Sequence, residues 1–192
     1  MSEVLALIAR RLSTHRRRVL HDPSQRRAAV LVPLFTQGDE VGLLFTRRTE
    51  SVEHHKGQIS FPGGAADEHD PNLLATALRE TTEELGIQAG EVRILGALDD
   101  VFTFVSGFLI TPYVGVIPYP PTFTINEAEI AEVITVPLEI FLDPSRLRVE
   151  EHERDGQRVQ LYFYSYGPHV IWGATARIVK SFVDTIFQEP QV

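Results

Sequence analysis

The chain has 192 residues, of which 43% are hydrophobic, and this length favours one buried core over two. It contains no cysteine, which excludes disulfides, thiolate metal sites and a cysteine nucleophile. The formal net charge is −8, and the acidic excess lies after residue 50. Because nucleic-acid binding depends on Lys and Arg neutralising phosphates, we expect no nucleic-acid partner. We expect a cytoplasmic protein.

The first 26 residues predict a short helix followed by a basic linker. Apolar residues recur there at helical spacing, at Val4, Leu5, Ile8 and Leu12. The basic cluster Arg16–Arg18 fits either a solvated surface or a site for an anion. The apolar stretch is too short for a signal sequence or a membrane span, so we expect no membrane association. We assign residues 1–26 to the helix and linker, and residues 27–192 to a single domain.

Strand-forming runs alternate with turn residues along the rest of the chain. Residues 37–40 and the pair Asp155-Gly156 are the turns of two expected hairpins. The strands that we predict are residues 28–35, 41–48, 92–98, 108–117, 129–136, 147–154 and 158–166.

Two further helices are predicted at residues 72–85 and 173–187. Asp70 and Pro71 precede the first of these, and Gly86 follows it as a stop. The second repeats apolar residues at helical spacing and should pack one face on the core. Strands interleaved with helices predict an α/β sandwich with a mixed sheet.

Three glutamates on the helix at residues 72–85 form the most informative pattern. Glu80, Glu83 and Glu84 stand at i, i+3 and i+4, so their carboxylates share one helix face. Carboxylates this close repel one another unless a positive charge lies among them, and Mg²⁺ and Mn²⁺ prefer such oxygen ligands. Arg79 is four residues before Glu83 and can orient it by an ion pair. The preceding glycines, Gly63 and Gly64, let main-chain groups approach a metal or a phosphate.

This segment resembles the Nudix box, the catalytic motif of the Nudix hydrolase family. The matching residues are Gly64, Asp70, Arg79-Glu80, Glu83-Glu84, Gly86 and Ile87. The chain departs from the motif in three places: Asp70 replaces the first glutamate, one extra residue precedes Arg79, and Thr81 fills an aliphatic position. All three helix glutamates are retained.

The flanking segments resemble the coenzyme A diphosphatase branch of that family. The similar segments are Leu44–Thr49, His55–Gly64 and Thr76–Glu80. Glu53 stands where the branch often has arginine. The likeness covers roughly residues 27–180.

The resemblance implies a Nudix-like α/β/α sandwich with a mixed β-sheet and a catalytic loop-helix-loop. It implies that Mg²⁺ or Mn²⁺ assists hydrolysis of coenzyme A, or of a derivative, to adenosine 3',5'-bisphosphate and 4'-phosphopantetheine. The metal ligands would be Glu80, Glu83, Glu84 and the main chain at Gly64. Arg79 would orient the site, and the general base would be Glu83, Glu127 or Glu129. The residues expected to bind substrate are Arg47, Arg48, Lys56 and Gly63.

Two alternatives stay open from the sequence. The protein could hydrolyse another diphosphate, such as NADH or ADP-ribose, because one fold hosts many substrates. It could also be a noncatalytic ligand sensor, although loss of the helix glutamates would be expected for that role. A homodimer is compatible with the sequence.

Overall fold

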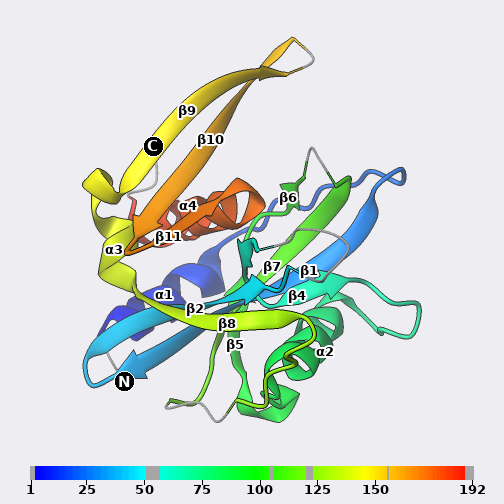
Figure 1. Ribbon diagram of the computed structural model, residues 1–192, viewed down its shortest axis with the longest axis vertical. Helices are drawn as coiled ribbons and strands as arrows, with labels where there is room; N and C mark the ends of the chain where they lie inside the picture. Colours follow the sequence, from blue (N-terminus) through cyan, green and yellow to red (C-terminus); the bar gives the residue numbers. More distant parts are fainter. Residues whose placement is uncertain (1–2, 51–56, 104–105, 120–122, 155, 189–192) are drawn as a thin grey trace.

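The chain folds around a mixed β-sheet with helices on both faces (Figure 1). The computed structural model describes residues 3–50, 57–103, 106–119, 123–154 and 156–188. The helices are α1 (Glu3–Thr14), α2 (Leu73–Leu85), α3 (Leu138–Leu142) and α4 (Gly173–Phe187). The strands are β1 (Arg26–Gln37), β2 (Glu40–Arg48), β3 (Ile59–Ser60), β4 (Gly63–Ala65), β5 (Arg93–Ala97), β6 (Val101–Phe102), β7 (Phe108–Val116), β8 (Ile130–Pro137), β9 (Leu147–Arg154), β10 (Gln157–Tyr166) and β11 (His169–Trp172).

Strand β1 lies at the centre of the main sheet, whose order is β3-β2-β1-β7-β5. It pairs in parallel with β7 and antiparallel with β2 and β4, so the sheet is mixed as expected. Strand β8 pairs with β2, and β6 pairs with β7. The register Ala29↔Gly64 and Val30↔Gly63 fixes the glycine-rich segment beside β1.

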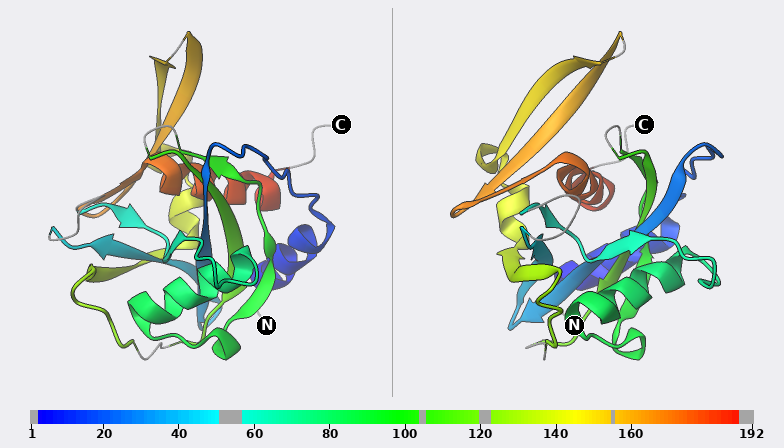
Figure 2. Two further views of the ribbon diagram at one scale, coloured as in Figure 1. Left: turned by 90° about the vertical axis from the view of Figure 1, so that its right-hand side faces the viewer. Right: turned by 45° about the vertical axis from the view of Figure 1, so that its right-hand side comes forward.

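Alternate residues of β1 face two separate apolar clusters. Val32 and Leu34 pack with residues of α1 and α4, whereas Leu31 and Phe35 pack with the end of α2. This follows from the two-residue period of a strand, which sends successive side chains to opposite faces. Figure 2 shows α2 on one side of the sheet and α1 and α4 on the other. The predicted α/β/α sandwich is therefore confirmed.

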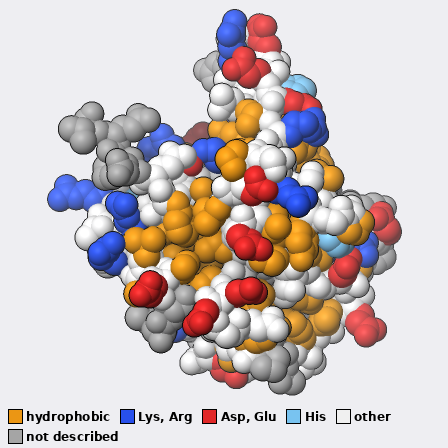
Figure 3. Space-filling view, turned by 90° about the vertical axis from the view of Figure 1, so that its left-hand side faces the viewer, with side chains coloured by type: hydrophobic (Ala, Val, Ile, Leu, Met, Phe, Trp, Pro, Cys, Tyr) orange, Lys and Arg blue, Asp and Glu red, His pale blue; other side chains and the backbone are white. Residues whose placement is uncertain are grey.

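Strands β9 and β10 form the hairpin that the sequence predicted, but with β11 they make a second sheet. The hairpin extends away from the main sheet (Figure 1). Charged side chains gather towards its end (Figure 3), where β9 contains Glu150, Glu151, His152 and Glu153. Asp155, which was expected in the turn, lies outside the described residues. The sequence did not predict this second sheet.

The N-terminal segment is tied to the body by two adjacent aspartates. Asp100 is buried and accepts hydrogen bonds from the Leu20 amide at 3.0 Å and the Thr111 hydroxyl at 2.7 Å. Asp99 accepts one from the Arg18 amide at 2.9 Å. Helix α1 buries Leu5, Ile8 and Leu12 in the same cluster as α4. A domain boundary at residue 26 stays a prediction.

Several short elements were not predicted, namely β3, β4, β6, β11 and α3. They are two to five residues long, which is too short for a hydrophobic period to show in the sequence. Within the described part of the chain, no helix is both long and apolar enough to cross a bilayer.

Helix α2 begins one residue later than expected because Asn72 is its N-cap. The Asn72 side chain accepts a hydrogen bond from the Ala75 amide at 3.0 Å. We predict that Asn72→Ala lowers the free energy of unfolding by about 1 kcal/mol, whereas Asn72→Asp changes it little, because Asp caps helices as well as Asn. Urea denaturation checks both variants, and an equal loss in the two would contradict the capping role.

Candidate active site

Helix α2 places the three predicted glutamates at the junction with the glycine-rich segment. The helix packs on the sheet through Ala77 and Leu85, both fully buried. Thr81, which replaces an aliphatic residue of the motif, is also fully buried, and its hydroxyl donates to the Ala77 carbonyl at 2.7 Å. A threonine is therefore accommodated there without an unsatisfied hydroxyl.

Arg79 connects the acidic groups around the helix. Its Nε and Nη2 atoms each lie 3.0 Å from a different oxygen of Asp70, a bidentate pair. Its Nη1 donates to Glu80 at 2.9 Å and to Glu83 at 3.0 Å, and Nη2 also donates to the Ala65 carbonyl at 3.2 Å. The predicted pair with Glu83 is confirmed. The Arg79 guanidinium holds the pKa of Asp70 well below its usual range.

The glycines at residues 63 and 64 permit contacts that a larger residue would prevent. A Cβ at Gly64 would lie 2.5 Å from the carboxylate of Glu80, and one at Gly63 would lie 2.4 Å from the Ala29 carbonyl oxygen. Gly63 also has φ 152°, a conformation that side chains rarely allow. The main chain of β4 can therefore run directly against the helix carboxylates.

Glu84 is the most deeply buried of the acidic groups, with a side chain 4% exposed. Its Oε1 lies 3.6 Å from Arg48 Nη1, and the Gly63 amide donates a hydrogen bond to it. Its Oε2 is buried without a hydrogen-bond partner. Burial raises the pKa of Glu84 to about 8, with a further rise from Glu80 and Glu129 and opposition from Arg48.

Glu80 and Glu83 differ in their surroundings. The Glu80 side chain is 19% exposed and that of Glu83 is 56% exposed. Burial raises the pKa of Glu80, an effect that Arg79 opposes and that Glu83 and Glu129 strengthen. The helix thus carries one buried carboxylate, Glu84, one half-buried, Glu80, and one exposed, Glu83.

Glu129 comes to the helix from the turn before β8. Its Oε2 lies 3.8 Å from Arg48 Nη2, so Arg48 lies between Glu129 and Glu84. Glu127 is exposed in the same turn. Of the two distant candidates for general base, the structure brings Glu129 to the cluster.

The residues expected to bind substrate lie in different surroundings. Arg47 Nε donates to Glu132 at 2.8 Å, on the neighbouring strand β8. Arg48 lies against Glu84 and Glu129, and Gly63 lies against Glu84. Lys56 lies outside the described residues. The sequence predicted arginines near the site but not their carboxylate partners, which come from distant strands and turns.

Asn126 was missed by the sequence analysis. Its amide nitrogen donates to the Glu84 carbonyl at 3.0 Å, and its side-chain Nδ2 donates to Glu129 Oε1 at 3.3 Å. The sequence did contain one indication of its role. An asparagine three residues before Glu129 is typical of a turn in which the asparagine side chain bonds to the main chain.

The donor set suits a hard divalent cation. Glu84 Oε2 is buried and unpartnered, the pKa values of Glu84 and Glu80 are raised, and the Gly64 main chain is adjacent to Glu80. Within the described ranges, no three acidic or histidine side chains converge closely enough to form a cluster that could hold an ion. Arg79 engages Glu80 and Glu83, so the side chains would have to adjust for a cation to bind.

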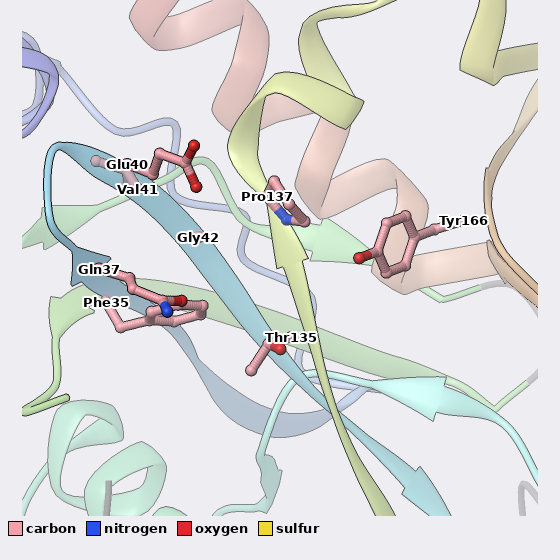
Figure 4. Close-up of a pocket in the computed structure, with 8 residues that line it drawn as sticks. All are labelled: Phe35, Gln37, Glu40, Val41, Gly42, Thr135, Pro137 and Tyr166. Atoms are coloured by element: carbon pink, nitrogen blue, oxygen red, sulfur yellow. The ribbon is translucent and has the colours of Figure 1, made fainter. Parts of the chain in front are cut away.

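Two hollows in the surface lie apart from the carboxylates. The first, of about 190 Å³, is lined by residues of β1, β2, β8 and β10 (Figure 4). It includes Gly42, six residues along β2 from Arg48, or about 20 Å at the rise of a strand. The second, of about 510 Å³, lies between α4, β6 and the N-terminal linker. Neither hollow is lined by a carboxylate of α2, so neither contains the candidate metal ligands.

We predict that the metal-free protein loses stability between pH 5 and pH 8. The pKa of Glu84 is higher in the folded chain, about 8, than its ordinary value of 4.5. The folded state therefore binds the proton more tightly than the unfolded chain does. This tighter binding stabilises the folded state fully below pH 4.5, and the stabilisation is lost as the pH rises towards 8. In urea denaturation of the chelator-treated protein, the free energy of unfolding should fall by on the order of a few kcal/mol over this pH range. Glu84→Gln should flatten this slope and the exposed Glu83→Gln should not; an unchanged slope in Glu84→Gln would contradict the assignment.

Asp70 should be required for the orientation of Arg79. We predict that Asp70→Asn lowers the free energy of unfolding by about 1–3 kcal/mol, because a charged hydrogen-bonded pair is broken. Asp70→Glu, which keeps the charge, should recover part of the loss. Denaturation at pH 7 measures both, and equal stability of Asp70→Asn and the unsubstituted protein would show that the pair contributes little.

Comparison with known proteins agrees with this geometry. Residues 25–158 match the family model described as NUDIX domain. The Nudix hydrolase NudL of Photorhabdus laumondii, itself described as uncharacterized, is 39% identical over 163 residues, covering 85% of this chain and 86% of that protein. NudL of Pectobacterium atrosepticum is 40% identical over 166 residues, covering 86% and 85%.

Solved structures show the same fold at lower identity. A MutT/nudix family protein from Enterococcus faecalis has a TM-score of 0.58 and 20% identity, covering 90% of this chain and 68% of that one. The NUDIX domain of Shewanella oneidensis NrtR, solved with ADP ribose, has a TM-score of 0.50 and 21% identity, covering 74% and 87%. With the family model spanning more than half of its residues and two relatives near 40% identity, this chain belongs to the Nudix family.

Proposed function

We propose that the protein hydrolyses the diphosphate linkage of coenzyme A or a derivative, giving adenosine 3',5'-bisphosphate and 4'-phosphopantetheine. Membership of the Nudix family supports the coarser activity, hydrolysis of a nucleoside diphosphate derivative. The observation that carries the proposal is the placement of Glu80 and Glu84 against the Gly63-Gly64 main chain, with Glu83 beside them on α2. The choice of coenzyme A rests on the resemblance of residues 44–49 and 55–64 to that branch.

The site is proposed to bind Mg²⁺ or Mn²⁺ through Glu80, Glu83, Glu84 and the Gly64 main chain. A divalent cation supplies charge neutralisation for the diphosphate oxygens and favours deprotonation of the attacking water. Arg79 keeps Glu80 and Glu83 aimed at one place by its hydrogen bonds to both. Burial keeps the ionised form of Glu84 unfavourable even beside Arg48, and a bound cation would favour that form.

Glu129 is proposed to accept the proton of the attacking water. It is 46% exposed, so water can reach it, and it lies near Glu80 and Glu84. Glu127 is exposed and lies in the same turn, and Glu83 is the third candidate. The contact of Glu129 with Arg48 favours it over Glu127, because a base must be held within reach of the proton that it removes.

Arg47, Arg48, Lys56 and Gly63 are proposed to bind the substrate phosphates. Guanidinium groups suit phosphate oxygens because they donate two parallel hydrogen bonds. For Arg47 this requires exchange of its carboxylate partner Glu132, which is 38% exposed, for a phosphate. Arg48 is 24% exposed and can contact substrate only through its outer edge.

We predict metal-dependent release of adenosine 3',5'-bisphosphate from coenzyme A. Mass spectrometry of products should detect it with Mg²⁺ or Mn²⁺ and not with a chelator. Glu83→Gln should lower the rate by at least about 100-fold, because a neutral amide replaces a carboxylate of the site.

A panel with NADH and ADP-ribose tests the substrate assignment. Turnover of either of these without turnover of coenzyme A would overturn the substrate and keep the diphosphate chemistry. No turnover of any of the three compounds would favour a noncatalytic ligand sensor.

A further inference from the structure

The turn that carries Glu129 is organised around Asn126. The Asn126 carbonyl accepts hydrogen bonds from the Glu129 amide at 3.0 Å and the Ile130 amide at 2.8 Å. Its own amide donates to the Glu84 carbonyl at 3.0 Å. The main chain of one residue therefore joins the last turn of α2 to the beginning of β8. This sets how far the Glu129 backbone lies from the helix.

The side chain of Asn126 has only one orientation that satisfies both of its neighbours. Its Oδ1 accepts a hydrogen bond from the Ala128 amide at 3.2 Å, which requires an oxygen at that position. Its Nδ2 donates to Glu129 Oε1 at 3.3 Å, which requires a nitrogen. Because an amide carries one of each, the Ala128 contact directs the donor towards Glu129.

Glu129 is held through both of its carboxylate oxygens. Asn126 Nδ2 contacts Oε1, and Arg48 Nη2 lies 3.8 Å from Oε2. Without these donors a glutamate side chain that is 46% exposed would sample many rotamers, and a negative charge on Glu80 would repel it. Arg48 is shared with Glu84, whereas the side-chain donor of Asn126 serves Glu129.

We propose that Asn126 is a positioning residue, which holds the carboxylate of Glu129 in front of the α2 carboxylates. The inference rests on the proposed function, in which Glu129 accepts a proton. Asparagine is needed because the same side chain must accept from Ala128 and donate to Glu129. Aspartate would keep the turn, since it forms the same local hydrogen bond, but would place a second negative charge against Glu129.

The contact itself is tested by NMR, without any activity. Asn72 and Asn126 are the two asparagines of the chain, so selective labelling with [¹⁵N]asparagine gives two pairs of side-chain amide signals, one pair for each residue. Glu129→Ala should shift the Asn126 signal and leave that of Asn72 unchanged. Glu127→Ala, in the same turn, is the matched control and should shift neither. An Asn126 signal that does not respond to Glu129→Ala would overturn the proposal.

The functional consequence is tested by a double-mutant cycle in steady-state kinetics. Asn126→Asp should lower kcat by about 10- to 100-fold with KM changed less than about threefold, because misplacing a reacting group slows the chemical step. In the Glu129→Gln background it should have almost no further effect. Asn72→Asp adds the same charge at a helix cap and should leave kcat unchanged. Thermal unfolding of each variant separates loss of folding from loss of positioning.

The outcomes separate the inference from the proposed function. Wild-type kcat in Asn126→Asp, or a loss that simply adds to that of Glu129→Gln, would overturn the positioning role. Full activity of Glu129→Gln would remove Glu129 as the base and the inference with it. If the unsubstituted protein turns over none of the candidate substrates, the proposed function fails, and the NMR result still decides whether Asn126 holds Glu129.

Discussion

The site depends on one guanidinium placed among like charges. Three glutamates share a face of α2, and their mutual repulsion would disfavour that arrangement if nothing opposed it. Arg79 donates to Glu80 and Glu83 while its other nitrogens are fixed by Asp70 and by the Ala65 carbonyl. The bidentate contact with Asp70 sets the plane of the guanidinium, and the carboxylates follow it. Asp70 is thus able to replace the glutamate of the family motif at this position.

The close approach of Glu80 to β4 explains why glycine is required beside the helix. Glu80 and Glu84 point towards β4, where a side chain on Gly64 would overlap with the Glu80 carboxylate. The main chain occupies that space, and the Gly63 amide satisfies part of Glu84. One carboxylate oxygen stays without a partner, a cost that a stably folded protein normally avoids. A cation bound there would remove this cost. The unpartnered oxygen of Glu84 would therefore both destabilise the metal-free protein and provide a ligand for the proposed metal.

The arrangement of the charged residues on α2 could be predicted from the sequence, because it depends on the local period of the helix. The spacing of Glu80, Glu83 and Glu84 placed them on one face, and the pair of Arg79 with Glu83 followed from helix geometry. Contacts between residues distant in the chain could not be predicted in this way. Arg48 meets Glu129 because β2 pairs with β8, which begins directly after Glu129, and it also reaches Glu84 on α2. The separate sheet of β9, β10 and β11 was missed because strand patterns do not specify pairing partners.

Thermal unfolding at pH 8 with and without Mn²⁺ tests most directly whether the buried carboxylates form a cation site. Mn²⁺ should raise the unfolding temperature of the unsubstituted protein, because ligand binding to the folded state stabilises it. Glu84→Gln should unfold at a higher temperature than the unsubstituted protein when metal is absent, and should lose most of the increase with Mn²⁺. The same Mn²⁺ effect in both proteins, or no effect in either, would contradict the assignment of Glu84 as a metal ligand.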